Sequence, residues 1–456
     1  MPDVTAESIR RRLAAPLPRR GASARAILAE VRRDIVPFLR DNGSPRFLGY
    51  VMSPASSAGI AADLLTSAFD QNVTAWRSAP AATELERLVV DWMGRIVGLP
   101  RGACGLLISG GSMATFTALA VARSMHAPAD CERAGLGGLG RRQMTIYASE
   151  EIHMSVPRAA QLLGLGTGSL RTIPCDDRLR IDTGALERAI LADRRKGHLP
   201  FCIAASAGTV NTGAVDPLRP LARIARDHGL WLHVDAAYGG PLGLHPDGRR
   251  LLDGIGEADS VALDPHKWLY APLDVGCVLF RSADAPRRTF ATHGEYAAVL
   301  SPGDRESYCF FDNGPELSRR FRALKVWMIL KYHGTDRITR RLGEELALAR
   351  YLGELITGHE ELELLAPVET SIVCFRYAPA GARARRARKQ LDDLNREVVL
   401  SLQRSGAVYL TNARVKGRFA LRACLVNFRT TRADMRTVVE EVVKTGRRLS
   451  RPSTRS

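Results

Sequence analysis

The chain has 456 residues, of which 45% are hydrophobic and 25% are charged. These values are typical of a soluble globular protein, and the length allows a large core divided between one big domain and smaller pieces. No uncharged apolar run is long enough to cross a membrane, and the charged N-terminal residues lack the hydrophobic segment of a signal peptide.

The balance of 65 Lys and Arg residues against 48 Asp and Glu residues gives a formal net charge of +17. An excess of positive charge is one mark of nucleic-acid binding. However, the arginines are spread along the whole chain, with no basic strip interleaved with aromatic residues, so we do not favour that function. The 8 cysteines form no CxxC pair and no metal-ligand cluster, which favours the reducing cytoplasm and predicts no metal site.

The first 57 residues are predicted to form an N-terminal arm. A basic helical pattern spans residues 24–39, and an extended stretch with Pro45, Phe47 and Tyr50 follows. An isolated helix of this kind has little core of its own. We therefore expect the arm to pack on another surface, for which a second subunit is the natural candidate.

The middle of the chain, residues 58–338, is predicted to be a large α/β domain. Short apolar runs alternate there with helical patterns, and this alternation predicts a mostly parallel, seven-stranded sheet covered on both faces. The runs are residues 105–109, 144–148, 170–173, 201–205, 230–235, 260–263 and 276–280.

The rest of the chain, residues 339–456, mixes helices and strands and is predicted to be a small α+β domain. Amphipathic helical patterns at residues 317–332 and 336–356 lead into it. The polar, irregular stretch at residues 296–315 before them is a candidate loop.

A glycine-rich turn, Ser109-Gly110-Gly111-Ser112, lies between an expected strand and an expected helix. Glycines allow backbone N–H groups to approach an anion, and the start of a helix favours negative charge. The turn is therefore a candidate phosphate site, to which Ser112 would add a hydroxyl donor. The alternative is an ordinary tight turn with a serine cap.

Polar residues also follow the next strands of the expected sheet. His153 follows the run 144–148, where an imidazole can stack on a flat ring or transfer protons, or can simply begin a helix. Asp235 ends an apolar strand, and a buried carboxylate there needs a cationic partner such as a protonated ring nitrogen, unless it only caps a helix. The small Ala237 would let a flat ring lie close, and Thr209 offers a hydroxyl group.

Lys267 follows the apolar run 260–263 in the sequence Asp264-Pro265-His266-Lys267-Trp268. Partial burial at such a position is expected to lower the pKa of the amine, which favours Schiff-base formation with an aldehyde. The alternative is a lysine whose amine simply reaches solvent from the end of a strand.

The four motifs occur at the carboxyl ends of expected strands, where α/β sheets bind their ligands. Asp235 and Lys267 are about one β/α unit apart, which predicts that they lie at neighbouring strand ends. A phosphate site, a carboxylate for a ring nitrogen, a stacking imidazole and an amine for a Schiff base together describe a pyridoxal phosphate site.

With these motifs the chain resembles the group II pyridoxal-phosphate-dependent amino-acid decarboxylases, the family of aromatic-L-amino-acid decarboxylase. The most specific strings are HVDAAYGG at residues 233–240 and DPHKWL at residues 264–269, and the resemblance runs from Pro45 to Arg422. It implies fold type I, the aspartate-aminotransferase-like fold. It also implies a homodimer with its active sites at the subunit interface.

The resemblance assigns roles to the motif residues. Lys267 would hold pyridoxal 5'-phosphate as an internal aldimine, Asp235 would pair with the ring nitrogen, and His153 would stack on the ring near the substrate carboxylate. Further contacts would come from Thr209 on the side of the phenolic oxygen, from Ala237 on the other face of the ring, and from Gly110, Gly111, Ser112, Asp264 and His266 around the phosphate. Asp264 stands where several relatives carry Asn.

The implied reaction is decarboxylation of an L-amino acid to an amine and CO2, through an external aldimine and a quinonoid that a loop tyrosine protonates. An ungapped count from Arg319 places Phe310 at the tyrosine position, with Tyr308 two residues away. Phenylalanine there resembles the aldehyde synthases of the same family, in which the carbanion reacts with O2 to give aldehyde, ammonia and peroxide. We favour simple decarboxylation because the placement of Phe310 depends on the alignment of the loop: a gap would restore Tyr308, and in a shortened loop another group would protonate Cα.

The side-chain pocket is expected to include Tyr50, Val51, Thr74 and Trp76, which suit an aromatic or apolar substrate. Another fold-type-I enzyme, such as an aminotransferase or carbon–sulfur lyase, would bind the α-carboxylate with a C-terminal arginine, for which Arg422 is the candidate. A basic, non-catalytic binding protein is a further alternative, and the complete set of motifs argues against it.

Overall fold

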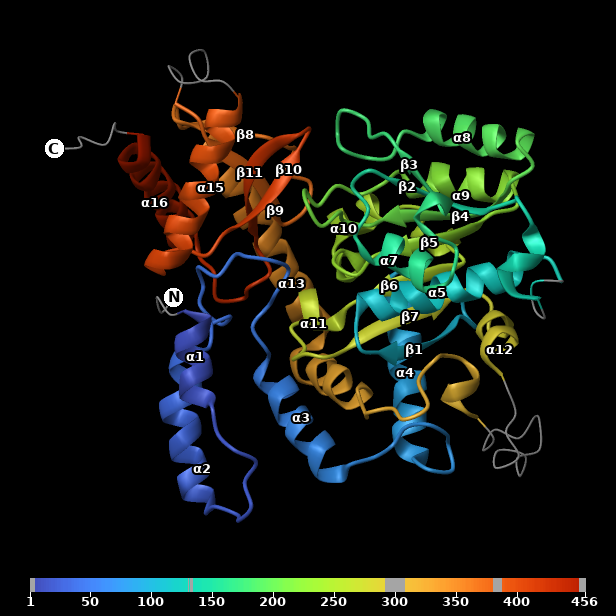
Figure 1. The fold of residues 1–456 in the computed structure, drawn as a ribbon, viewed down its shortest axis with the longest axis horizontal. Helices are drawn as coiled ribbons and strands as arrows, with labels where there is room; N and C mark the ends of the chain where they lie inside the picture. Colours follow the sequence, from blue (N-terminus) through green and yellow to red (C-terminus); the bar gives the residue numbers. More distant parts are fainter. Residues whose placement is uncertain (1–4, 130, 132–133, 292–307, 380–387, 451–456) are drawn as a thin grey trace.

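One sheet of seven strands organises most of the chain, in the order β1-β7-β6-β5-β4-β2-β3 (Figure 1). The computed structural model describes residues 5–129, 131, 134–291, 308–379 and 388–450. The strands are β1 (Cys104–Ile108), β2 (Met144–Ser149), β3 (Leu170–Ile173), β4 (Leu199–Ser206), β5 (Trp231–Asp235), β6 (Ser260–Leu263) and β7 (Gly276–Phe280). Only β7 runs antiparallel to its neighbours. The expected α/β class and the expected strands are confirmed.

Helices cover both faces of this sheet, since every residue of β2, β5, β6 and β7 is buried. They are α3 (Ser57–Phe69), α4 (Pro80–Ile96), α5 (Gly111–His126), α7 (Ser155–Leu162), α8 (Thr183–Arg195), α9 (Leu218–Asp227), α10 (Pro246–Leu251), α11 (Pro265–Trp268) and α12 (Asp284–Phe290). Helix α9 illustrates the sequence rule: Leu218, Leu221, Ala222 and Ala225 recur at helical spacing and are all buried.

A long helix, α13 (Ala323–Thr357), connects the large sheet to the C-terminal part of the chain. The helix is interrupted at Gly334, whose φ of 70° lies in the left-handed region that glycine adopts without strain. The interruption separates the two helical patterns expected at residues 317–332 and 336–356. The first pattern begins later than expected, because residues 317–322 are not helical.

A second, antiparallel sheet of four strands has the order β10-β11-β9-β8. Its strands are β8 (Leu362–Leu364), β9 (Ile372–Tyr377), β10 (Thr411–Val415) and β11 (Arg418–Cys424), and α15 (Arg388–Ser405) and α16 (Arg432–Ser450) pack against it with their own apolar core. Leu48 joins this core, where its N–H donates to the carbonyl of Tyr409 at 2.9 Å. The chain divisions at residues 57 and 338 stay a prediction.

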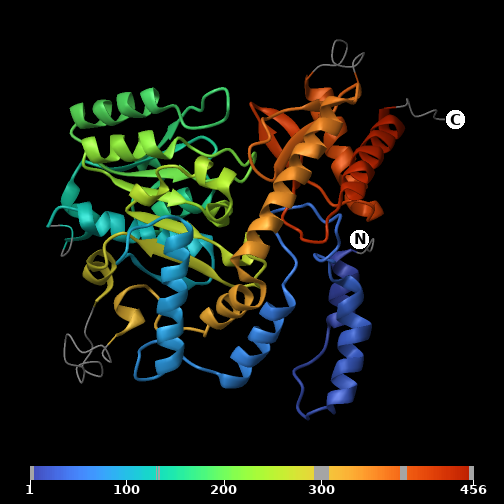
Figure 2. The ribbon, with the colours of Figure 1, turned by 180° about the vertical axis from the view of Figure 1, so that it is seen from behind.

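The N-terminal helices α1 (Ala6–Leu13) and α2 (Ala24–Glu30) project beyond the two sheets (Figures 1 and 2). Neither helix has a buried residue, although both carry apolar side chains. The arm expected in this region therefore has no core of its own. The loop expected at residues 296–315 falls largely on residues 292–307, which lie outside the described part of the chain.

A buried ion pair between Arg319 and Glu86 joins the segment before α13 to helix α4. The guanidinium also donates to the carbonyls of Val73 at 2.9 Å and Leu107 at 2.7 Å, and it lies 4.1 Å from the centre of the Phe310 ring. Both charged side chains are fully buried. Without Arg319, Glu86 would have no ion-pair partner among the described residues, and without Glu86 the guanidinium would keep only the carboxylate of Glu316, 3.9 Å from its Nε.

The substitution Glu86→Leu should therefore destabilise the protein by about 3–5 kcal/mol, the usual effect of removing one partner of a buried pair. The measurement is the free energy of unfolding in urea, followed by far-UV circular dichroism. The exposed pair between Arg87 and Glu84, on the same helix, provides the control. Glu84→Leu should change the free energy by less than about 1 kcal/mol, and equal effects of the two substitutions would contradict the assignment.

Candidate active site

A cavity of about 860 Å3 lies at the carboxyl edge of the large sheet and is lined by residues of both the large sheet and the small domain. The sequence motifs contribute Gly110, Gly111, Ser112, His153, Thr209, Asp235, Ala237, Asp264, His266 and Lys267 to its lining. The small domain contributes Gln403, Tyr409, Thr411, Asn412 and Arg422. The structure therefore brings all of the expected cofactor-binding residues to one cavity.

The pairing of β5 with β6 brings Asp235 and Lys267 to the same edge. The strands are parallel, and Asp235 is the register partner of Ala262, which lies five residues before Lys267 in the sequence. Strand β5 ends at Asp235, and α11, which begins two residues after β6 ends, carries Lys267. The expectation of neighbouring strand ends is confirmed.

Lys267 is held by a carboxylate close to it in sequence. Its Nζ lies 2.9 Å from Oδ2 of Asp264, which is almost fully buried. Burial favours the neutral amine, but attraction to Asp264 and Asp235 outweighs burial, so the pKa of Lys267 is raised. The sequence-based expectation of a lowered pKa was wrong, because it considered desolvation without the two carboxylates.

The turn that carries Lys267 is fixed by the aromatic residues that follow it. Trp268 is fully buried and stacks on Tyr238, with 4.9 Å between ring centres. The indole Nε1 of Trp268 donates to Glu345 of α13, and the hydroxyl of Tyr270 donates to the same carboxylate at 2.9 Å. Burial raises the pKa of Glu345 to about 8. Through Glu345, helix α13 thus anchors the turn that carries Lys267.

The glycine-rich turn passes very close to its neighbours. A Cβ on Gly111 would lie 2.7 Å from Oδ2 of Asp264 and 3.0 Å from Cβ of Ala237. A Cβ on Gly276 of β7 would lie 2.5 Å from Cα of Gly110. These approaches require glycine, and they keep the backbone at the start of α5 open toward the cavity.

His153 follows β2 and has a defined tautomer. The N–H of Ser155 donates to Nδ1 of His153 at 3.2 Å, so the neutral ring carries its proton on Nε2. Burial lowers the pKa of His153, although the nearby Asp235 opposes the shift. The ring is therefore neutral at pH 7.

His266 and Thr209 are held by local hydrogen bonds. Nδ1 of His266 lies 2.6 Å from the carbonyl oxygen of Val275, and burial lowers the pKa of the ring. Thr209 is buried after β4, where its hydroxyl lies 3.0 Å from that of Thr212. Both side chains therefore line the cavity in fixed orientations.

The small domain adds residues that the motifs did not identify. Tyr409 lies beside Tyr50, with hydroxyl groups 3.4 Å apart. Arg422 is almost fully buried and donates from Nε to the carbonyl of Val210 at 2.7 Å and from Nη1 to that of Tyr50 at 2.9 Å. Its Nη2 has no hydrogen-bond partner among the residues that the structure describes. No local pattern around Tyr409 signals this position, because it joins the cavity only through the domain contact.

The four residues expected in the substrate pocket divide into two pairs. Tyr50 and Val51 line the cavity, but Thr74 and Trp76 do not. The latter two belong to a segment that pairs with residues 308–310: the N–H of Trp76 donates to the carbonyl of Tyr308 at 2.9 Å. This pairing holds both segments away from the cavity of their own chain.

Tyr308 and Phe310, the expected loop residues, also lie outside this cavity. Phe310 is fully buried beneath the guanidinium of Arg319, and its ring lies 5.0 Å from that of Tyr308. The ungapped alignment that placed Phe310 at the reacting position therefore points to a residue of the core. Burial raises the pKa of Tyr308, so it remains a protonated phenol at neutral pH.

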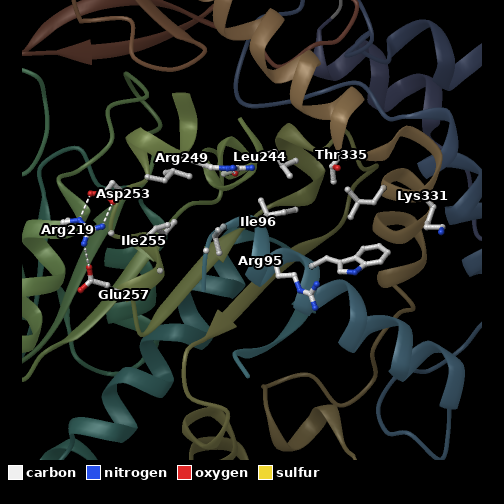
Figure 3. Close-up of a pocket in the computed structure, with 18 residues that line it drawn as sticks. Arg95, Ile96, Arg219, Leu244, Arg249, Asp253, Ile255, Glu257, Lys331 and Thr335 are labelled. Atoms are coloured by element: carbon white, nitrogen blue, oxygen red, sulfur yellow. Dashed lines mark hydrogen bonds and ion pairs between the residues drawn. The ribbon is translucent and has the colours of Figure 1, made fainter. Parts of the chain in front are cut away.

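A second cavity, of about 800 Å3, lies between α4, α10 and α13 (Figure 3). Arg219 is paired with Asp253 and Glu257 at one end of this cavity, while Lys331 lies at the other. None of the expected site residues lines it. The two cavities are similar in volume, so the residues that line them identify the first cavity as the candidate active site.

The fold and the residues of the first cavity define a fold-type-I pyridoxal phosphate enzyme. The profile of the pyridoxal-dependent decarboxylase conserved domain matches residues 7–378. The chain belongs to this family and is a pyridoxal-phosphate-dependent carboxy-lyase.

Individual relatives agree with the family. The chain is 35% identical over 439 residues to aromatic-L-amino-acid decarboxylase from Bacillus atrophaeus, covering 96% of this chain and 89% of that protein. It is 32% identical over 411 residues to phenylacetaldehyde synthase from Petunia hybrida, covering 88% and 81%. The crystal structure of Oryza sativa TDC with PLP and tryptamine superposes with a TM-score of 0.91 at 30% identity, covering 99% of this chain and 93% of that one.

The residues present fit the cofactor of this family. The carboxylate of Asp235 lines the cavity, is almost fully buried and has no ion-pair partner among the described residues, which suits a protonated ring nitrogen. Lys267 offers the amine for the aldehyde, and the glycine turn offers backbone N–H groups at the start of α5 for the phosphate. Oδ1 of Asp264 also lacks a partner. The cofactor, when bound, would provide partners for these groups.

The substitution Asp264→Asn should lower the pKa of Lys267, because it removes the nearest negative charge. Lys267 must be neutral to react with the aldehyde, so apoprotein carrying this substitution should take up pyridoxal phosphate faster at pH values below the pKa of Lys267. The measurement is the rate of appearance of the visible absorbance band as a function of pH, and its midpoint should move to lower pH.

The control for this experiment is Asp247→Asn on α10, which removes a surface carboxylate outside the cavity. Its midpoint should equal that of the wild type. An unchanged midpoint in Asp264→Asn would show that the carboxylate does not set the protonation of Lys267.

Proposed function

We propose that this enzyme decarboxylates an aromatic L-amino acid to the corresponding amine and CO2. The observation that carries the proposal is the convergence of Lys267, Asp235 and His153 on one cavity that also contains tyrosine side chains and an unpaired arginine group. When bound, the cofactor would supply an electron sink for the bond broken at the substrate Cα.

Each of the cavity residues would have its own role in binding the cofactor. Lys267 would bind the cofactor aldehyde, and Asp235 would keep the ring nitrogen protonated. His153, neutral and with its proton on Nε2, would pack on the ring opposite Ala237. Thr209 would contact the phenolic side of the ring. These roles are supported by the position of each residue in the cavity lining.

Phosphate binding is proposed for the turn Gly110–Ser112, with His266 nearby. Asp264 is a less obvious ligand for an anion, because its carboxylate is negative. We infer that Asp264 acts mainly on Lys267, to which it lies close, and that it stabilises the charged amine until the cofactor binds. Aspartate at this position, where several relatives carry Asn, would then affect the pKa of Lys267 rather than the binding of phosphate.

An aromatic substrate is supported by Tyr50, Val51 and Tyr409 in the lining and by relatives named for aromatic amino acids. The unpaired Nη2 of Arg422 would attract the substrate carboxylate, because it is a buried donor without a partner. Arg422 alone does not favour an aminotransferase, since the family to which the chain belongs is that of the decarboxylases.

Oxidative production of an aldehyde is the second candidate. It is favoured by relatives named phenylacetaldehyde synthase, from Petunia hybrida and a Rosa hybrid cultivar. The burial of Phe310 beneath Arg319 removes the residue on which the comparison with aldehyde synthases was based. Tyr308 is a protonated phenol close to the expected position, so we favour protonation of Cα and release of the amine.

We further propose a homodimer whose subunits complete one another's active sites. Helices α1 and α2 bury no residue, and α3 exposes Ile60, Leu64 and Phe69, all of them apolar. A second subunit would cover these surfaces. It would also explain why the paired segments that carry Trp76 and Tyr308 lie away from the cavity of their own chain.

The proposed domains are an arm at residues 1–57, a large domain at 58–338 and a small domain at 339–456, with the cavity between the last two. We propose the cytoplasm as the compartment. No two of the 8 cysteines form a disulfide within the described part of the chain, which suits a reducing environment. No described helix is long and apolar enough to span a membrane.

A screen of L-amino acids with purified holoenzyme should give CO2 and amine in equal amounts from an aromatic substrate. Peroxide and aldehyde should stay below a few per cent of the CO2, because Cα is protonated rather than oxidised. The control is Lys267→Ala, which should lose both the visible absorbance band and all turnover. Peroxide formed in step with CO2 would establish the aldehyde synthase reaction instead.

Sedimentation should give the mass of a dimer for the wild type and a shift toward monomer for Leu64→Glu/Phe69→Glu, because each charge is placed on an apolar face of α3. Activity should fall at least tenfold in parallel, since each site would lose the partner segment. The matched control is Leu191→Glu, an exposed leucine of α8. A fully active monomer would contradict the shared site.

A further inference from the structure

A third cavity, of about 510 Å3, is lined by Tyr270, which follows Lys267 by three residues. It is bounded by the start of α3 at Ser56, by Tyr270 after α11, by Phe428 and by the interrupted part of α13. In Figures 1 and 2, α3 and α13 lie side by side in this region. None of the residues assigned to the cofactor lines this cavity.

The cavity carries an excess of positive charge. Arg337, Arg340 and Arg341 line it, and Glu344 is its only acidic residue. The carboxylate of Glu344 is already bound by Arg341 at 2.6 Å. Arg337 and Arg340 have no ion pair or hydrogen bond with any described residue, so two guanidinium groups at the cavity lack a counter-charge.

The spacing of these arginines brings like charges together on one face of α13, where Arg337 and Arg340 are both exposed. Residues three and four apart lie on the same face of a helix, and like charges there repel one another. Arg337 therefore shares a face with both Arg340 and Arg341. Burial lowers the pKa of the nearby His333, and the positive charge of Arg337 lowers it further. A bound anion would relieve the repulsion.

The remaining walls indicate which anion fits. Tyr270, Tyr332 and Phe428 provide aromatic surface, and Tyr270 and Phe428 meet edge to face with 5.4 Å between ring centres. Guanidinium groups bind phosphate through several hydrogen bonds in a plane, which a set of arginines at one cavity can supply. A phosphate group on a flat organic body matches both parts of the lining.

The cavity is connected to the active site through hydrogen bonds. Tyr270 lines the cavity with its ring, while its hydroxyl donates at 2.9 Å to Glu345, which also accepts from Trp268. Trp268 directly follows Lys267 in the chain. Arg341 adds a second connection, because its Nε lies 3.7 Å from Oε1 of Glu345.

We propose that this cavity binds a small phosphate ester with a flat organic body and that its occupancy alters the position of Lys267 through Tyr270, Glu345 and Trp268. A ligand that draws Arg341 toward itself weakens the contact of Arg341 with Glu345, the carboxylate that anchors the lysine-bearing turn. By linkage, an effect of the ligand on cofactor binding is matched by an equal effect of the cofactor on ligand binding. The proposal goes beyond decarboxylation, and its binding step does not depend on the identity of the substrate.

The test uses holoenzyme and phenyl phosphate as the probe, with binding measured by isothermal titration calorimetry at constant ionic strength. We expect saturable binding that weakens at least tenfold in Arg337→Gln/Arg340→Gln. The matched control is Arg188→Gln/Arg195→Gln, which removes two exposed arginines from α8 and should bind like the wild type. Inorganic phosphate should bind at least threefold more weakly than phenyl phosphate, because it cannot contact the aromatic wall.

The connection to Lys267 is tested with Tyr270→Phe, which keeps the ring and removes the hydroxyl that reaches Glu345. In the wild type, phenyl phosphate should change the dissociation constant of the cofactor at least twofold, measured by its visible absorbance. In Tyr270→Phe the probe should bind within twofold of the wild type, and this effect should disappear.

Three outcomes would overturn the proposal. They are equal binding by the two double variants, no saturable binding by the wild type, and an unchanged cofactor affinity when the probe is bound. The calorimetry remains informative if no amino acid is decarboxylated, so failure of this proposal and failure of the proposed function can be told apart.

Discussion

The parallel pairing of β5 with β6 is the constraint on which the active site depends. It places the end of one strand, at Asp235, beside the strand that leads to Lys267. A carboxylate and an amine in neighbouring positions at a buried edge lower each other's cost of burial. The rest of the site, including the glycine turn after β1 and His153 after β2, is added along the same edge of the sheet.

The electrostatics of the site follow from this convergence. Asp264 and Asp235 together stabilise the charged form of Lys267 against burial, although Asp235 makes no direct ion pair with any described residue. The neutral His153 fits the same arrangement, because a second positive charge next to Lys267 would be unfavourable. The protein is thus arranged to receive a cationic ring and an aldehyde at positions where its own charges are unsatisfied.

Helix α13 connects this edge to the remainder of the molecule. It begins just after the buried Arg319, is interrupted at Gly334, and reaches the small domain, and on the way Glu345 holds Trp268 and Tyr270. The small domain in turn supplies Tyr409 and Arg422 to the cavity. A change at the interrupted part of α13 therefore has a short structural route to Lys267, along a helix that both domains share.

The sequence by itself determined the strands, the α/β class and the cofactor site, because apolar runs and strand-end motifs are local patterns. Lys267, Asp235 and His153 are each a weak signal among the residues beside them, and their order and spacing along the chain identified the site together. The tertiary structure decided the raised pKa of Lys267, which depends on carboxylates reached through space. It also decided that Tyr409 lines the cavity and that Phe310 is buried under Arg319, since domain packing and a buried ion pair have no local signature in the sequence.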